Sequence, residues 1–188
     1  AKSEELDRLE GIYRRLLKDS GVTAIDGRGA LAGANTVEIG GERLSADTIL
    51  VATGGWPVLP EIPGAELAIS SNEAFDLAKL PERIVIVGGG YIACEFAGIF
   101  NGLGAEVVQL YRSDMILRGF DMDVREVCCD EMRKTGVDVR LNENAVKLEK
   151  SANGISVTTS QGNVLEADQV LFATGRAPNT AGIGLDTV

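Results

Sequence analysis

Three consecutive glycines, Gly88, Gly89 and Gly90, stand between a run of β-branched residues and a stretch with helical character, and Ala93 follows them. A strand that ends in G-x-G-x-x-G/A turns tightly and brings backbone N–H groups close to a pyrophosphate. The helix that begins at the turn adds free N–H donors and the positive end of its dipole. The spacing therefore predicts a dinucleotide-binding turn, although glycine-rich turns between a strand and a helix also occur without a nucleotide.

Two arginines stand where such a site distinguishes one dinucleotide from the other. In an NAD site, an Asp or Glu at the end of the next strand binds the ribose 2′-hydroxyl. Here the expected strand, Glu106 to Tyr111, is followed by Arg112 and then by Arg118. Because a guanidinium suits a 2′-phosphate, the pattern favours NADPH over NADH. The alternative is that both arginines lie in a solvated loop.

The elements around these residues follow from the hydrophobic pattern. It predicts a strand at 84–87, a helix after the glycine turn, a helix from Asp123 to Thr135 and a strand from Val137 to Leu141. Antiparallel strands are expected around Val146, Ile155 to Thr159 and Val164. The predicted fold class is α/β: a Rossmann-like dinucleotide-binding domain with a parallel sheet and an antiparallel β-meander.

The segment before this domain has the composition of a connection. The prolines between Trp56 and Gly64 fix φ and remove N–H donors, which predicts a crossover loop. Ser70 and Glu73 have capping-box spacing, so a short helix is expected to follow and to run to Ala78. Pro81 ends the connection before the strand that leads to the glycines.

Composition limits the classes of partner. The 188 residues include 18 basic and 28 acidic side chains, a net charge of −10, which argues against nucleic acid and anionic membranes. No apolar run reaches membrane-spanning length, and no signal peptide or metal site is expected. Three cysteines and no histidine fit a reducing cytoplasm, and the lack of histidine removes the commonest general acid–base. The chain therefore has the character of a cofactor binder more than of a complete catalyst.

The chain also contains an internal repeat. The segment 46–55, ADTILVATGG, matches the segment 167–176, ADQVLFATGR, at six of ten positions. A helix (Glu4 to Lys18) with an apolar stripe expected to pack in a core, a strand (Val22 to Ile25) and a hairpin turning at Gly40-Gly41 are predicted before the first copy. This first unit has no glycine-rich front half, so we expect one before Ala1 and interpret residues 1–54 as the back half of a second such domain.

Three segments carry a family resemblance: Tyr91–Gly98, Arg112–Asp121 and Leu171–Asn179. They resemble the glutathione reductases of bacterial and plant type, within the FAD- and NADPH-dependent pyridine nucleotide-disulfide oxidoreductases. The arginine segment is the most specific, because dihydrolipoamide dehydrogenases have an acid there for NAD. The resemblance implies that residues 1–54 end an FAD-binding domain, that 55–176 form an NADPH-binding domain and that 177–188 begin a central segment returning to the FAD domain.

The resemblance also implies site residues. For NADPH they are Gly88, Gly89, Gly90, Tyr91, Ile92, Glu95, Arg112, Arg118, Gly175 and Arg176, with Tyr91 over the nicotinamide side of the flavin and Glu95 paired to a lysine outside this chain. For FAD they are Gly29, Thr53 and Gly54, as part of an incomplete site. The alternatives are that Tyr91 is a core tyrosine at a helix start and that Glu95 is an ordinary carboxylate on a helix face.

The redox groups of that family are not matched. No C-x4-C pair occurs: Cys94 is expected in the core, and Cys128 and Cys129 are adjacent on a helix. The resemblance implies a homodimeric parent that passes electrons from NADPH through FAD and a disulfide to glutathione disulfide. We expect this chain to bind NADPH without reductase activity. Other readings are a trypanothione- or mercury-type reductase, a non-catalytic NADP-binding module, or a disordered or proteolysed remnant.

Overall fold

A computed structural model describes residues 2–188, and the chain divides into two compact units. Unit 1 comprises the chain up to Thr53 together with Thr180–Val188, and unit 2 is Gly54–Asn179. Each unit is described by itself.

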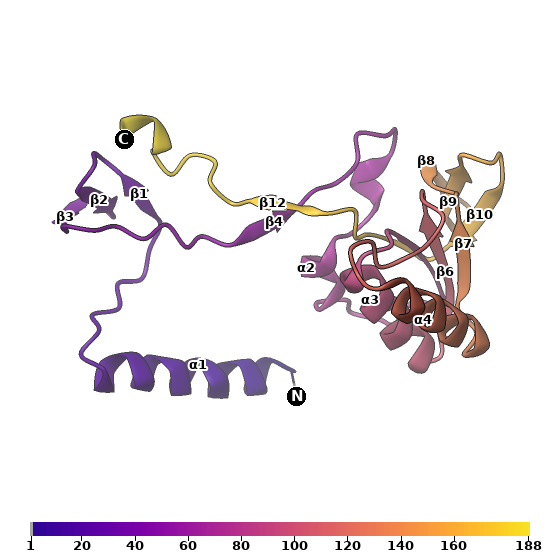
Figure 1. The fold of residues 1–188 in the computed structure, drawn as a ribbon, viewed down its shortest axis with the longest axis horizontal. Coiled ribbons are helices and arrows are strands. Elements are labelled where there is room, and N and C mark those ends of the chain that lie inside the picture. The colour runs from indigo at the N-terminus through magenta and orange to yellow at the C-terminus, as the bar shows by residue number, and fades with distance from the viewer. Residues whose placement is uncertain (1) are drawn as a thin grey trace. The chain divides into compact units, whose positions relative to one another are not determined.

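Unit 2 is built on a four-stranded parallel sheet with the strand order β11-β5-β6-β7, of which Figure 1 labels β6 and β7. These strands are β5 (Arg83–Val87), β6 (Glu106–Tyr111), β7 (Asp138–Leu141) and β11 (Gln169–Phe172). Helix α3 (Tyr91–Gly102) connects β5 to β6, and α4 (Met122–Lys134) connects β6 to β7. These are the strand–helix–strand units that the hydrophobic pattern predicts, and the bounds of β6 agree with the prediction.

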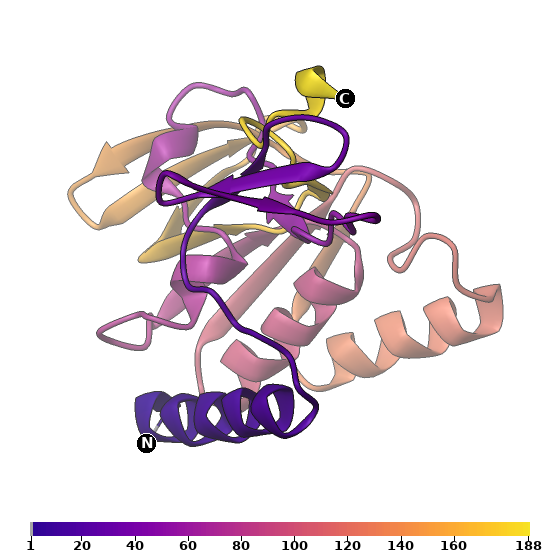
Figure 2. The ribbon, with the colours of Figure 1, turned by 90° about the vertical axis from the view of Figure 1, so that its left-hand side faces the viewer.

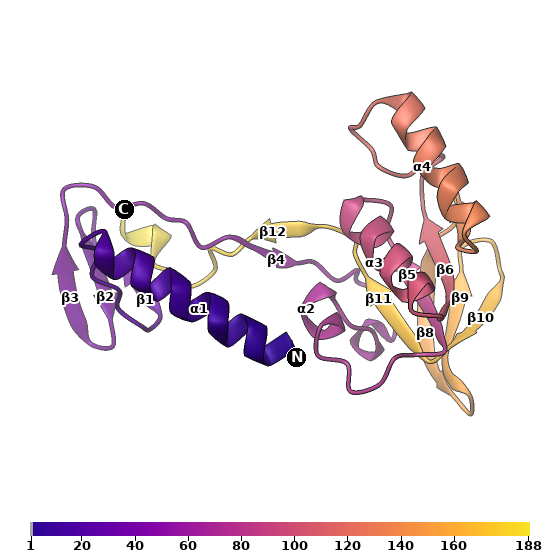
Figure 3. The same cartoon turned by 90° about the horizontal axis from the view of Figure 1, so that it is seen from below.

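A second, antiparallel sheet lies on the other side of the parallel one. Its strands are β8 (Ala145–Ser151), β9 (Gly154–Thr159) and β10 (Val164–Ala167). Figure 3 shows α3 and α4 on one face of the parallel sheet and this meander on the opposite face. The α/β fold class with a parallel sheet and a meander is therefore confirmed.

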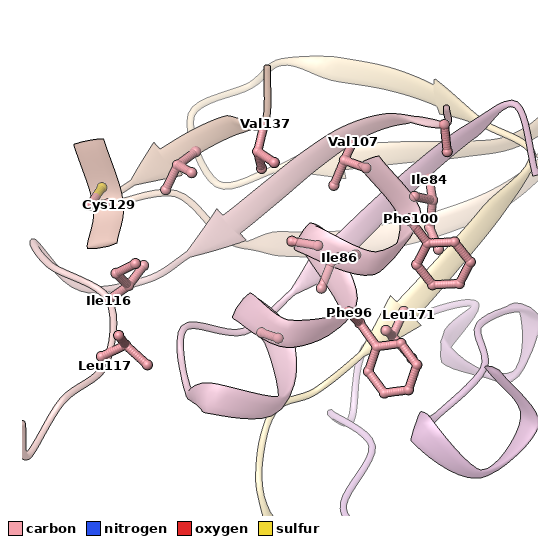
Figure 4. Close-up of a cluster of buried hydrophobic side chains, with 14 residues drawn as sticks. Ile84, Ile86, Phe96, Phe100, Val107, Ile116, Leu117, Cys129, Val137 and Leu171 are labelled. Carbon is pink, nitrogen blue, oxygen red and sulfur yellow. The ribbon is translucent and has the colours of Figure 1, made fainter. Parts of the chain in front are cut away.

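The two faces explain why β5 is apolar throughout. Ile84 and Ile86 belong to the core under the helices, together with Phe96 and Phe100 of α3 (Figure 4). Val85 and Val87 alternate with them and belong to the core under the meander. A strand covered on both sides needs apolar residues at successive positions, which its sequence provides.

The connection before β5 is more ordered than predicted. Its first residues form β4 (Gly55–Pro57), which pairs with β12 (Arg176–Pro178) in a two-stranded ribbon, so a crossover loop beginning at Trp56 is wrong for this part. Proline is tolerated here because a two-stranded ribbon consists of edge strands. The 3₁₀ helix η1 (Ala65–Leu67) follows.

The predicted capping box is present at the start of α2 (Ser71–Ala74). The Ser70 hydroxyl accepts from the Asn72 N–H at 3.2 Å, and the Glu73 carboxylate accepts from the Ser70 N–H at 2.8 Å. The helix ends four residues before the predicted Ala78, where the Asp76 N–H donates to the Glu73 carbonyl in a tightened last turn.

Unit 1 contains α1 (Lys2–Asp19) and a small antiparallel sheet of β1 (Gly29–Leu31), β2 (Thr36–Ile39) and β3 (Glu42–Ser45). The hairpin of β2 and β3 turns at Gly40-Gly41 as predicted, and an extended segment joins α1 to β1 (Figure 2). The predicted strand from Val22 to Ile25 is wrong, because a strand needs a pairing partner and the described residues provide none there. The chain ends in η2 (Leu185–Thr187).

The apolar stripe of α1 is not covered within unit 1. Of the predicted stripe, Leu6 and Leu16 are each more than half exposed and Leu17 is 41% exposed, and no described residue of the helix is buried. The expected core packing of this stripe is therefore wrong for the described residues. The C-terminal segment does join unit 1, since the Leu31 N–H donates to the Ile183 carbonyl at 2.7 Å.

None of the helices in residues 2–188 combines the length and the apolar character that crossing a membrane requires.

The core of unit 2 gives a direct stability prediction. Leu171 of β11 is completely buried, so Leu171→Ala should lower the free energy of unfolding by about 2–5 kcal/mol in a denaturant titration. Leu103→Ala is the matched control: Leu103 is 63% exposed, and its truncation should change stability by about 0.5 kcal/mol or less. Equal losses for the two variants would contradict the described core.

Candidate nucleotide-binding site

Two of the three glycines after β5 are required by packing. Gly88 has φ 145°, and a Cβ there would overlap the carbonyl oxygen of Ala173, which follows β11. A Cβ at Gly89 would collide with the ring of Tyr111 at the end of β6. Gly88 and Gly89 therefore let the ends of β5, β6 and β11 approach one another.

The third glycine faces open space. Gly90 is the N-cap of α3 with φ −82°, and a Cβ there would meet no atom within 4 Å. No side chain among residues 2–188 caps this helix, so its first N–H groups can bind an anion. Gly90 therefore keeps space open beside the helix N-terminus, which is the geometry that a pyrophosphate requires.

A cleft of about 440 Å³ opens at this point, and we call it the arginine cleft. This volume lies in the range of small-molecule sites. Its lining includes all three glycines together with Arg112, Arg118, Asn144, Thr174 and Gly175. The structure thus brings both predicted arginines to the glycine turn.

The two arginines of the cleft differ from the other arginines of unit 2. Arg83 and Arg140 each bond a carboxylate, while Arg125, Arg133 and Arg176 donate to backbone carbonyls. Among the residues that the structure describes, Arg112 and Arg118 form no hydrogen bond or ion pair, and both are exposed. The cleft's lining contains no carboxylate, so it presents two uncommitted positive charges in a protein of net charge −10.

Sequence reasoning missed several lining residues. Asn144 reaches the cleft from the turn between β7 and β8, and its N–H donates to the Ser160 hydroxyl at 3.1 Å. Thr174 follows β11 and donates its hydroxyl hydrogen to the Val58 carbonyl at 2.7 Å. No spacing rule pointed to Asn144 or Val58, because their place depends on how the meander and the connecting ribbon fold back.

A second cleft of about 250 Å³ adjoins the first, and we call it the tyrosine cleft. Tyr91 and Ile92 line it with Phe172, and it shares Gly90 and Gly175 with the arginine cleft. Tyr91 is 56% exposed and is not a core residue. The tyrosine cleft is the more apolar of the two in its lining.

The other predicted site residues lie in different surroundings. Arg176 lines the tyrosine cleft, but its guanidinium donates to the Gly55 carbonyl and fixes the β4–β12 ribbon. Glu95 is exposed on α3 and lines neither cleft.

The three predicted FAD positions do not lie in the clefts either. Gly29 and Thr53 belong to unit 1, and Gly54 begins unit 2; all three are exposed. Nothing in their geometry tests the FAD assignment, which stays a prediction.

The cysteines have the surroundings of structural residues. Cys94 is half-buried against the core, where burial raises the pKa of its thiol to about 11 and keeps it protonated at neutral pH. Cys129 is fully buried, and its pKa is likewise raised by burial. All three cysteines are free thiols. The expectation that Cys94 is a packing residue is consistent with this environment.

Comparison with known proteins identifies the family. The sequence profile of the family described as pyridine nucleotide-disulphide oxidoreductase matches residues 1–187. The chain belongs to this family. The resemblance inferred from its three sequence segments is thereby confirmed.

The relatives within this family include named glutathione reductases. The chain is 52% identical to glutathione reductase from Burkholderia cepacia over 188 residues, covering all of this chain and 42% of that protein. It is 47% identical to the chloroplastic/mitochondrial glutathione reductase of Pisum sativum, again over the whole chain and 34% of the relative. Trypanothione reductase from Trypanosoma congolense is 40% identical over 202 aligned residues, covering all of this chain and 41% of the relative.

Solved structures agree with the fold. The HOCl-induced flavoprotein disulfide reductase RclA from Escherichia coli matches the whole chain and 44% of its own length, with a TM-score of 0.90 and 28% identity. The chain thus spans less than half the length of each of these relatives.

The open space at Gly90 leads to a prediction that separates binding from folding. Gly90→Ala should lower the thermal unfolding midpoint only slightly, because the added Cβ meets no protein atom and the cost is limited to the weaker N-cap preference of alanine. It should weaken pyridine-nucleotide binding by about tenfold or more, since the methyl group enters the space in front of free helix N–H groups.

Gly98→Ala in the same helix is the matched control. Its Cβ also meets nothing within 4 Å, and Gly98 is exposed and lines neither cleft. Alanine should stabilise the helix interior by about 0.5–1 kcal/mol and leave binding unchanged. Unaltered nucleotide affinity in Gly90→Ala, measured by fluorescence titration, would rule out this binding geometry.

Proposed function

We propose that unit 2 is an NADPH-binding domain, for which the sequence-based bounds are residues 55–176, and that the two clefts hold the nucleotide. The observation that carries this proposal is the pair of uncommitted guanidinium groups of Arg112 and Arg118, beside a helix N-terminus with space at Gly90. A dinucleotide with an additional 2′-phosphate has anionic groups suited to both features.

Each part of the clefts has a role in this proposal. The N–H groups at the start of α3 bind the pyrophosphate, with Gly88 and Gly89 allowing the close turn. Arg112 and Arg118 bind the 2′-phosphate. Tyr91 and Ile92 line the apolar tyrosine cleft, which suits the nicotinamide end, with Gly175 at the junction of the clefts and Arg176 beside it.

When bound, NADPH supplies a hydride, and the chain's contribution is to bind and orient the nucleotide. Tyr91 lines the tyrosine cleft and is 56% exposed, so its ring is available to cover that end of the nucleotide. No histidine is available for proton transfer, and the half-buried Cys94 thiol stays protonated. We therefore propose that the 188-residue chain binds NADPH without reducing a disulfide by itself.

For the whole protein we propose NADPH-dependent reduction of glutathione disulfide through FAD. The support is the identity of 52% and 47% to proteins named glutathione reductases. In this proposal residues 1–54 and 177–188 belong to the FAD part, with Gly29, Thr53 and Gly54 near FAD and Glu95 facing a lysine of that part. A homodimer in the cytoplasm completes the proposal, although the pea relative is named chloroplastic/mitochondrial.

A trypanothione-type substrate is the second candidate, favoured by the 40% identity to a trypanothione reductase. Assaying the whole protein with NADPH and each disulfide in turn distinguishes the two. Faster reduction of trypanothione disulfide than of glutathione disulfide would overturn the first assignment.

Arg112 provides the test of NADPH binding. Arg112→Ala should raise the Kd for NADPH by about tenfold or more, because a charge-assisted hydrogen bond contributes about 1.5–3 kcal/mol. The Kd for NADH should stay nearly the same, since NADH lacks the 2′-phosphate. Fluorescence titration of the 188-residue chain measures both.

Arg140→Ala is the control for the loss of one positive charge. Arg140 bonds Asp138 at 2.8 Å and does not line either cleft, so both affinities should be retained. Equal losses of NADPH and NADH affinity in Arg112→Ala would refute the 2′-phosphate assignment.

A further inference from the structure

The segment between β6 and α4 contains Arg118, which lines the arginine cleft. Buried side chains and hydrogen bonds fix this segment to the rest of unit 2. We call residues 112–120 the arginine loop. Ile116 and Leu117 are buried and lie in the same apolar cluster as Cys129 of α4 (Figure 4). Leu117 has φ 55°, and its N–H donates to the Gly89 carbonyl at 2.5 Å. The residue directly before Arg118 is thus bonded to the glycine turn.

A second attachment comes from α4. Arg125 donates through Nε to the Ile116 carbonyl at 2.7 Å and through Nη2 to the Met115 carbonyl at 2.8 Å. The two donors of one planar guanidinium fix two successive carbonyl groups of the loop. Arg125 does not line either cleft.

The position of Arg125 is not explained by helix preference. It lies in the first turns of α4, soon after the N-cap Asp121, where a positive charge opposes the helix dipole. The two carbonyl groups of the loop provide the interaction that offsets this disadvantage. The cation at this unfavourable helix position is therefore engaged by the arginine loop.

Loss of this contact would affect the cleft through Arg118. Of the residues in the arginine loop, only the short span at 116–117 is buried, and 113–120 contain no helix or strand of regular length. Without Arg125, the Met115 and Ile116 carbonyls lose their partner, and the backbone that leads to Leu117 and Arg118 is less restricted. Arg118 would then be less well positioned, while the glycine turn keeps its own packing against Ala173 and Tyr111.

We propose that Arg125 is a positioning residue for nucleotide selectivity: through the Met115 and Ile116 carbonyls it sets the place of Arg118, and so the preference for a 2′-phosphate. This inference rests on the proposed NADPH binding. Arg125 lines neither cleft, and yet its loss is expected to weaken the binding of NADPH and not that of NADH.

The test measures the ratio of the Kd for NADH to the Kd for NADPH in the 188-residue chain, by fluorescence titration. Arg125→Met keeps most of the side chain's length and removes both donors. We expect this ratio to fall at least fivefold, mainly through weaker NADPH binding, with NADH affinity within twofold of the parent chain. The same loss is expected for adenosine 2′,5′-bisphosphate, which carries the 2′-phosphate without a nicotinamide.

Arg133→Met is the matched control. Arg133 lies on the same helix and donates to one backbone carbonyl, that of Val139 at 3.0 Å, outside both clefts. Its loss removes the same charge and one hydrogen bond to a backbone carbonyl, against two for Arg125, and the ratio should stay within twofold. A merely structural or long-range electrostatic role of Arg125 would give equal effects in the two variants and would overturn the proposal.

Two further outcomes are decisive. If Arg125→Met does not fold, as judged by thermal unfolding, Arg125→Lys replaces it, because an ammonium keeps the charge without the planar pair of donors. A Kd ratio lowered threefold or more in Arg125→Lys supports the proposal, and an unchanged ratio overturns it.

The parent chain separates this proposal from the proposed function. If the parent chain binds NADH as tightly as NADPH, the proposed function itself fails. If the parent chain is selective and a folded Arg125→Met variant is equally selective, only the role of Arg125 is refuted.

Discussion

The close approach of three strand ends is the constraint on which the site depends. At Gly88 the chain passes against the Ala173 carbonyl, and at Gly89 it passes against the Tyr111 ring, with no room for a Cβ at either place. Ligands bind at the carboxyl ends of parallel strands, and here the turn after β5, Arg112 after β6 and Thr174 after β11 meet at that edge. A side chain at Gly88 or Gly89 would separate these ends, and the cleft would lose its shape before any ligand contact was lost.

The arginine cleft is positively charged because its two arginines are not bonded to protein groups in the part of the chain that the structure describes, unlike the other arginines of unit 2. Five arginines of unit 2 have their guanidinium groups engaged by carboxylates or carbonyls, and they stabilise the fold. Arg112 and Arg118 are exposed and form no ion pair with any residue in 2–188, so binding an anion requires no such pair to break. The distinction between structural and binding arginines is therefore made by their neighbours, and not by the residue type.

The sequence predicts the local parts of the site and misses those that depend on distant contacts. The limits of β6, the glycine turn and the capping box at Ser70 follow from patterns within a few residues. The Val22–Ile25 strand fails because pairing needs a partner elsewhere in the chain, and Asn144 and Val58 enter the cleft only through folding of the meander and the ribbon. The positive φ of Leu117 could not be predicted from the sequence, because no glycine stands at that position. Burial of the side chain and the hydrogen bond of its N–H to the Gly89 carbonyl maintain this conformation.

The arrangement of the two clefts limits the class of ligand further than either cleft alone. They meet at Gly90 and Gly175, beside the N-terminus of α3. Arg112 and Arg118 line only the arginine cleft, and Ile92 and Phe172 line only the tyrosine cleft. Arg176 also lines the tyrosine cleft, but its guanidinium is engaged by the Gly55 carbonyl. A ligand that uses both must be elongated, anionic in the middle and at one end, and uncharged or weakly polar at the opposite end. A nucleoside triphosphate carries all its charge in one chain of phosphates at one end. A 2′-phosphorylated pyridine dinucleotide carries a pyrophosphate in the middle, a phosphate near one end and the nicotinamide at the other, which is the required order of groups. The order of charged and apolar surfaces along the two clefts thus adds to the glycine motif as support for a 2′-phosphorylated pyridine dinucleotide.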